Sequence, residues 1–297
     1  MSKAVLEGKM PAASVVLEKM STLAMRTHAR LFTEYAFSKS QYPPIFVYQM
    51  GKVASTTVCT SLNQARVKNS VFHLHFLSDD LPRHIATHKN AGFRVVPYHL
   101  ILGTAVRKAL LKHRDTTCKI ISLTRDPIAF VISNIFQNPK LVKADIENDF
   151  GEVSAEKVGD YLNRRLSVPD EFSYQDNWFD REIKKVFGID VFEQPFASDV
   201  GYQTYVGDSA ELLLIRLEDL SSKGGRAIAE FLGLSQPLEL MQRNVRSSAK
   251  GSSEYEALLK NFHLDRRLCR EIYSRKLVRH FYNDEMIEGF ISKWTGQ

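Results

Sequence analysis

Short apolar segments alternate with amphipathic segments along the first half of the chain. The apolar segments are rich in β-branched and aromatic residues, which favours buried strands, and the segments between them place apolar residues at helical spacing. The predicted strands are residues 45–48, 70–76, 93–98 and 119–124. The predicted helices are residues 55–66, 79–89, 104–113 and 127–136. Strands that alternate with helices indicate βαβ units, and therefore an α/β fold with a central, mainly parallel sheet flanked by helices.

The two ends and the middle of the chain have a mainly helical pattern. The first forty residues predict a helix, which the YPP sequence at 42–44 ends because proline lacks a backbone donor and restricts the residue before it. Residues 145–187 are helical and charged, residues 212–217 form a late apolar strand, and the chain from Ser221 onward is mostly helical. Because no linker divides the chain, we predict a single domain over residues 1–297.

Composition excludes several classes of protein. Of the 297 residues, 44% are hydrophobic and 10% aromatic, which excludes a disordered chain. The uncharged runs stop short of the roughly 18–20 apolar residues that a membrane span needs. Residues 1–8 lack the apolar core of a secretory signal. The three cysteines, Cys59, Cys118 and Cys269, lie far apart, which is typical of a reducing compartment. We therefore expect a cytoplasmic protein.

The charge balance indicates an anionic partner. Forty Lys and Arg against 34 Asp and Glu give a net charge of +6. Nucleic acid is not supported, because no dense basic run interleaved with aromatic residues occurs. A nucleotide and an acidic glycan remain open.

The first candidate site follows the strand at 45–48, where the sequence is QMGKVASTT. Gly51 and Ala54 allow the backbone to approach a ligand, and the N–H groups of the following helix start attract an anion. Lys52 adds a mobile positive charge. The helix start also carries three hydroxyl donors, Ser55, Thr56 and Thr57. This pattern favours a phosphate cradle, with an ordinary helix start beside a surface lysine as the alternative.

This segment differs from the P-loop of nucleotide triphosphatases. That motif has the form GxxxxGK[ST], in which a hydroxyl directly after the lysine holds Mg²⁺. Here Val53 follows Lys52, and the hydroxyls come later. A metal-dependent nucleotide kinase is therefore the weaker interpretation.

The second candidate site follows the strand at 119–124. Asp126 fits the N-cap of the next helix and Pro127 its first position. Ser133 lies two turns after the cap, so it can share a face with Arg125 and converge on one anion at the carboxyl edge of the sheet. The alternative is that Arg125 pairs with a carboxylate and Ser133 only packs.

Together the two segments resemble the sulfotransferases that use 3′-phosphoadenosine 5′-phosphosulfate (PAPS). In that family a K-x-[GA]-[ST]-[ST] loop binds the 5′-phosphosulfate, and residues 52–56 match it. An R-[DN]-P turn followed by a serine binds the 3′-phosphate, and residues 125–127 with Ser133 match that spacing. Residues 178–180 (WFD), 216–220 (RLEDL) and 280–282 (HFY) also look like a bacterial sulfotransferase-like group assigned to capsular polysaccharide synthesis. The resemblance spans roughly residues 44–294.

The resemblance implies a P-loop-like three-layer fold and a metal-free site. It implies an N-terminal helical extension at 1–40, a cofactor-binding core at 41–140, and a helical acceptor-side and closing region at 141–297. Lys52 would neutralise the leaving nucleotide. The 5′-phosphate would be held by the loop and helix start, and the nucleotide covered by a late loop. The residues that would bind the cofactor are Gly51, Lys52, Val53, Ala54, Ser55, Thr56, Thr57, Arg125, Ser133, Lys250 and Gly251.

A pair of histidines supplies a candidate base. His73 and His75 alternate with apolar residues, so a strand points both to one face. Histidine has an ordinary pKa of about 6.5, which suits removal of a hydroxyl proton. Glycan 2-O-sulfotransferases resemble this H-x-H pattern, and the match implies His75 as the base with His73 second. Two histidines satisfied by backbone partners are the alternative, and a zinc site through His84 and His88 has no evident third ligand.

The sequence therefore predicts a PAPS-dependent O-sulfotransferase that acts on a carbohydrate hydroxyl, in polysaccharide or capsule synthesis. A P-loop-like nucleotide kinase is one alternative. A non-catalytic glycan-assembly protein that retains the cofactor fold is the other. We expect a glycan acceptor as the partner, and the pattern predicts neither its identity nor the oligomeric state.

Overall fold

The computed structural model describes residues 12–90, 95–137, 139–152, 154–241 and 262–296. Its strands are β1 (Ile45–Tyr48), β2 (Val71–Leu74), β3 (Cys118–Thr124), β4 (Tyr202–Val206) and β5 (Ala210–Arg216). Its helices in the first half are α1 (Ala12–Ser38), α2 (Ser55–Gln64), α3 (Leu81–Asn90), α4 (Tyr98–Lys112), α5 (Pro127–Ile135) and α6 (Pro139–Phe150). The later helices are α7 (Ala155–Leu166), α8 (Ser173–Trp178), α9 (Lys185–Phe187), α10 (Leu217–Asp219), α11 (Gly225–Leu232), α13 (Arg266–Tyr273), α14 (Lys276–Phe281) and α15 (Asp284–Thr295). A 3-10 helix, η1 (Pro169–Phe172), and two π-helical segments, η2 (Phe179–Lys184) and η3 (Leu220–Gly224), join some of them.

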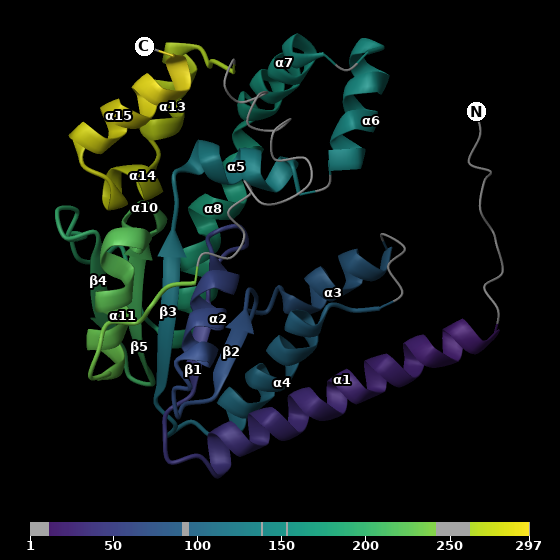
Figure 1. The fold of residues 1–297 in the computed structure, drawn as a ribbon, viewed down its shortest axis with the longest axis vertical. Helices are drawn as coiled ribbons and strands as arrows, with labels where there is room; N and C mark the ends of the chain where they lie inside the picture. The colour runs from purple at the N-terminus through teal and green to yellow at the C-terminus, as the bar shows by residue number, and fades with distance from the viewer. Residues whose placement is uncertain (1–11, 91–94, 138, 153, 242–261, 297) are drawn as a thin grey trace.

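The five strands form one sheet with the order β2-β1-β3-β5-β4. Neighbouring strands are parallel except at the edge, where β4 pairs antiparallel with β5. In Figure 1, α2 and α11 lie in front of the sheet and α8 lies behind it. The predicted α/β fold with a central, mainly parallel sheet between layers of helices is therefore confirmed.

Two predicted features of the sheet are wrong. The strand predicted over residues 93–98 does not form in its described part, because residues 95–97 are irregular and Tyr98 begins α4. Pro97 stands at the N-cap of that helix, and a proline N-cap interrupts a strand because it has no N–H to donate. Strand β4 was not predicted. Most of its residues are partly or fully exposed, so it lacks the apolar pattern that marks the central strands.

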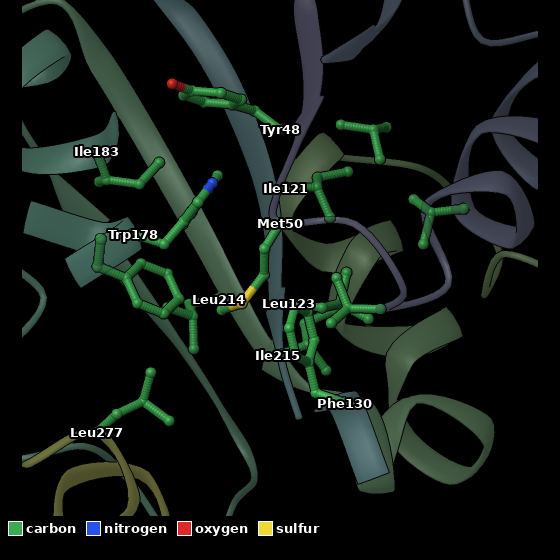
Figure 2. Close-up of a cluster of buried hydrophobic side chains, with 14 of the residues drawn as sticks. Tyr48, Met50, Ile121, Leu123, Phe130, Trp178, Ile183, Leu214, Ile215 and Leu277 are labelled. Carbon is green, nitrogen blue, oxygen red and sulfur yellow. The ribbon is translucent and has the colours of Figure 1, made fainter. Parts of the chain in front are cut away.

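The core lies on both faces of the three central strands. Figure 2 shows Tyr48, Met50 and Leu214 on the side of Trp178 and Ile183 of the α8–η2 segment, and Ile121 on the other side of the sheet. All of these side chains are buried, with exposed fractions of 1% or less. The helical second half therefore packs directly onto the sheet, which explains the absence of a linker.

Helix α1 packs mainly against α4, which in turn contacts β2. From its end near the lower edge of the sheet, α1 extends away from the body of the molecule (Figure 1). Among the described residues, no helix is long and apolar enough to span a membrane.

Candidate functional site

The candidate site lies where the chain changes direction across the sheet. From β1 the chain passes through α2 to β2 on one side, and it then crosses back to β3 on the other side of β1. The carboxyl ends of β1 and β3 therefore form a topological switch point, which is the usual ligand crevice of an open α/β sheet. The loop with Lys52 follows β1, and Arg125 follows β3. Both predicted segments thus lie at this crevice.

The loop between β1 and α2 has an unusual backbone. Lys52 and Ala54 have positive φ angles of 65° and 61°, in the left-handed region that costs an L-residue roughly 1–2 kcal/mol. The buried side chain of Gln49 spans the turn, and its Nε2 donates to the carbonyl of Val53 at 3.2 Å. Gln49 therefore helps to hold the loop in this strained form.

The start of α2 is available to an anion. Ala54 is its N-cap and makes no side-chain capping bond. Ahead of it, a Cβ placed on Gly51 would meet no atom within 4 Å, so space is open over the loop. The first N–H groups of a helix lack intrahelical acceptors, and the positive end of the helix dipole attracts negative charge. This arrangement fits a phosphate group.

Arg125 contacts the lysine loop directly. Its Nη1 donates to the carbonyl of Lys52 at 2.9 Å, across 73 residues of sequence. The Arg125 side chain is half-buried, which places a fixed positive charge beside the loop. The structure therefore brings these two predicted residues together.

The remaining predicted cofactor residues occupy different environments. Thr56 is exposed at the start of α2 and Thr57 is half-buried, whereas Ser55 and Ser133 are only 8% and 9% exposed. The side chain of Val53 lies in the core, so only its backbone can face a ligand. Lys250 and Gly251 lie outside the described residues.

The turn at Arg125 is fixed by its neighbour Asp126. As predicted, Asp126 caps α5: its Oδ1 accepts from the N–H of Ile128 at 3.0 Å, with Pro127 at the first helical position. The same buried carboxylate accepts from the hydroxyl of Tyr273 at 2.8 Å and from Nε1 of Trp294 at 2.9 Å. The C-terminal helices α13 and α15 thereby hold the turn that carries Arg125.

Glu218 supports the same turn from α10, which directly follows β5. Its Oε1 accepts from the backbone N–H of Asp126 at 2.9 Å, and its Oε2 accepts from the hydroxyl of Tyr282 at 3.0 Å. Burial raises the pKa of the Glu218 carboxyl, and the nearby charge of Asp126 adds to the shift. In the sequence this residue could be interpreted only as a helix cap, because its partners are 92 and 64 residues away.

His75 lies on the other side of the loop from Arg125, just after β2. Its Nδ1 is 2.7 Å from the carbonyl oxygen of Gln49. A carbonyl only accepts, so Nδ1 carries the proton, and Nε2 of the neutral ring is left as the basic nitrogen. Burial lowers the pKa of His75, and the bond to Gln49 opposes that shift. The ring is therefore neutral and oriented, as a general base requires.

His73 and a histidine not singled out from the sequence, His99, flank His75. The ring centroids of His73 and His99 lie 4.8 Å and 5.2 Å from that of His75. Burial, together with the charge of neighbouring histidines, lowers the pKa of both His73 and His99 to about 4. His99 lies in the first turn of α4, and only the crossover between β2 and β3 brings it here, so the sequence offers no local signal for it.

The loop after β2 is held by a second buried carboxylate that the sequence pattern missed. Glu182 of η2 accepts from the N–H groups of Leu77 and Ser78 at 2.8 Å and 2.9 Å. It also accepts from the Ser78 hydroxyl at 2.7 Å and from the hydroxyl of Tyr48. A single glutamate in an amphipathic helix looks like a surface residue, and only its tertiary partners show this role.

The zinc alternative finds no support among the described residues. The ring of His84 stacks on Phe76 at 3.7 Å, and Nε2 of His88 lies 3.1 Å from the carbonyl oxygen of Val95. No group of three or more His, Cys, Asp or Glu in the described part of the chain is arranged to hold a metal ion.

The fold defines an α/β protein, and the residues described above form a candidate anion site at the β1/β3 switch point with a histidine beside it. Residues 160–283 match the family NKWYS, described as "Putative capsular polysaccharide synthesis protein". The match covers less than half of the chain, and it includes all three later segments that resemble this group. Glu182, Glu218 and Tyr282 lie within it. No curated protein and no solved structure matches the chain.

Proposed function

We propose that this protein is a PAPS-dependent O-sulfotransferase that transfers a sulfuryl group to a carbohydrate hydroxyl in capsular or related polysaccharide synthesis. The observation that carries the proposal is the meeting of three groups at one loop. Arg125 contacts the carbonyl of Lys52, and His75 is oriented by the carbonyl of Gln49 at the beginning of the same loop. The match of residues 160–283 supports the polysaccharide context.

The residues at the crevice suit a nucleotide that carries phosphates at both ends of its ribose. The uncapped start of α2 and its hydroxyls would hold the 5′-phosphate. Arg125, with Ser133 on α5, would hold the 3′-phosphate, because a guanidinium fork matches phosphate oxygens. When bound, PAPS supplies the sulfuryl group and is left as the bisphosphate nucleotide.

In the proposed reaction, Nε2 of His75 accepts the proton of the acceptor hydroxyl. The acceptor oxygen forms its bond to sulfur as the bond between sulfur and the bridging phosphate oxygen breaks. Lys52 neutralises the charge that develops on that bridging oxygen. By analogy with phosphoryl transfer the transition state is loose, so positioning and electrostatics provide most of the rate enhancement.

Ligand-dependent thermal stability tests the nucleotide site. We expect 3′-phosphoadenosine 5′-phosphate to raise the Tm, since a ligand at 100 times its Kd stabilises the folded state by about 2.7 kcal/mol. Arg125→Ala should lose most of that shift. Arg114→Ala, which removes an exposed arginine before β3, is the matched control and should keep it. Stabilisation by ATP with Mg²⁺ and none by the bisphosphate would refute the proposal and favour the kinase alternative.

Transfer of labelled sulfate from PAPS to a polysaccharide panel tests the chemistry. His75→Ala and Lys52→Ala should lower kcat by about 100-fold or more while the Tm shift with the bisphosphate remains. An unchanged kcat in His75→Ala would remove His75 as the base and direct attention to His73. Binding of the bisphosphate without transfer to any acceptor would favour the non-catalytic alternative.

A further inference from the structure

A cavity of about 410 Å³ lies between α1, β2 and α4, next to the histidine group. His28 and Phe32 of α1 form one wall, His73 of β2 forms the floor, and Tyr98 and His99 of α4 form the opposite wall. Its volume lies in the range of pockets that hold small ligands, roughly 300–1,000 Å³. None of the functions assigned above uses α1, yet α1 completes this cavity.

The lining of the cavity is mainly apolar, and among the described residues its polar groups are three histidine rings and one tyrosine hydroxyl. Val71 and Leu102 complete the lining, so the described part of the chain contributes no Asp, Glu, Lys or Arg to it. The ring of Phe32 and the phenol of Tyr98 offer apolar faces with a hydroxyl at one end. Nδ1 of His28 lies 2.6 Å from the hydroxyl of Tyr98, which ties α1 to α4. Such a mixture of ring faces and neutral hydrogen-bonding groups suits a sugar ring, whose C–H faces stack and whose hydroxyls both donate and accept.

His73 has an unused hydrogen-bonding atom at this place. Its Nε2 is buried and has no partner among the described residues. A buried polar atom without a partner costs about 1–3 kcal/mol, so a ligand hydroxyl that bonded to Nε2 after a turn of the His73 ring would recover that free energy. Because burial lowers the pKa of His73 and His99 to about 4, both rings are neutral near pH 7.

The cavity adjoins the proposed base. Of the residues that line it, His73 and His99 both have rings within 5.2 Å of the ring of His75, centroid to centroid. Only the rings of His73 and His99 therefore separate a ligand in the cavity from the ring of His75, which in turn contacts the loop that carries Lys52.

We propose that this cavity binds an uncharged sugar residue of the acceptor and thereby selects neutral hexoses over uronic acids. The proposal rests on the sulfotransferase function proposed above, and it adds the class of acceptor. A hexose presents only hydroxyls and C–H faces, which the lining can satisfy. A uronate would bring a carboxylate into a partly buried site where the described residues offer no lysine or arginine to pair with it, which is costly.

Binding of matched oligosaccharides in the presence of 3′-phosphoadenosine 5′-phosphate tests the proposal. Hyaluronan and heparosan oligosaccharides serve as uronate probes, and their carboxyl-reduced forms serve as neutral probes of the same length and linkage. We expect the carboxyl-reduced forms to bind about tenfold more tightly or better, by saturation-transfer NMR titration and by KM for sulfate transfer. Equal or tighter binding of the uronate forms, or no binding of either form, would overturn the proposal.

Substitutions in the lining separate this proposal from the function on which it rests. Tyr98→Phe removes one hydroxyl and Phe32→Ala one ring face, and each should weaken binding of the neutral probe about 3- to 10-fold. Neither should change the Tm shift with the bisphosphate. Leu111→Ala, at an exposed position of α4, is the matched control and should bind normally. Normal probe binding by both lining variants would refute the cavity as the sugar site. Loss of the bisphosphate shift in the unmodified protein would instead refute the proposed function.

Discussion

Replacing Asp126 by alanine removes one buried carboxylate that accepts three hydrogen bonds. The N–H of Ile128 loses its cap, which costs about 1 kcal/mol. The hydroxyl of Tyr273 and the indole N–H of Trp294, in side chains that are 1% and 5% exposed, lose their acceptor. Each buried donor left unpaired costs about 1–3 kcal/mol, so we expect a total loss of about 3–7 kcal/mol. That is a large part of the roughly 5–15 kcal/mol by which a folded protein is stable.

Urea unfolding at neutral pH measures this loss. With an m-value of about 3 kcal/mol per molar, the midpoint of Asp126→Ala should fall by about 1–2 M with little change in the slope. Asp126→Asn keeps one oxygen that can still accept from Ile128 and Tyr273, but its amide nitrogen cannot accept from Trp294, so it should lose less than Asp126→Ala, about 1–3 kcal/mol. Glu147→Ala, at an exposed position of α6, should stay within about 0.5 kcal/mol of the unmodified protein. A loss below about 1 kcal/mol in Asp126→Ala would refute the reasoning from buried donors.

Two further predictions concern pH and backbone strain. His73 and His99 titrate at about 4 when folded, against an ordinary pKa of 6.5, so between these values the unfolded chain binds more protons. The free energy of unfolding should therefore fall as the pH is lowered from 6.5 toward 4. In urea titrations, His73→Gln and His99→Gln should each make the free energy of unfolding depend less steeply on pH. An unchanged pH dependence in both variants would contradict the lowered pKa values. Ala54 has a left-handed φ of 61°, which glycine adopts without strain, although glycine also raises the conformational entropy of the unfolded chain. We therefore expect Ala54→Gly to raise the free energy of unfolding by about 0–1 kcal/mol, measured from the Tm. A clear loss of stability would show that this φ carries no strain.

The features predicted well from the sequence are those whose cause is local. The cap at Asp126 follows from adjacent residues in a strand-to-helix turn, and the structure confirms it. The three central strands and the parallel sheet follow from short apolar segments between amphipathic helices. Because parallel strands share a carboxyl edge, the proximity of Lys52 and Arg125 also follows from the order of elements.

The features that the sequence could not supply depend on distant partners. Glu182 and His99 acquire their roles only when helices fold back onto the end of β2. Glu182 is 104 residues from its partner Ser78 in the sequence, and His99 comes well after His75, at the start of the next-but-one helix. Edge strand β4 lacks an apolar pattern because only one of its faces and one of its edges are covered. The predicted strand at 93–98 shows the opposite error, since its apolar residues precede a helix with a proline N-cap.

The hydrogen bonds to Asp126 can form only after α13 and α15 have been synthesised. The partners of its carboxylate come 147 and 168 residues later, and β3 obtains its second neighbour only when β5 has emerged. Contacts of such sequence separation slow folding, because the entropy of closing long loops must be overcome before they form. On the ribosome, the turn that carries Arg125 therefore stays unlocked until α15 is made. A nascent chain that already contains Lys52, His75 and Arg125 would still lack a fixed Arg125 turn, so the candidate site would form only in a late step of folding.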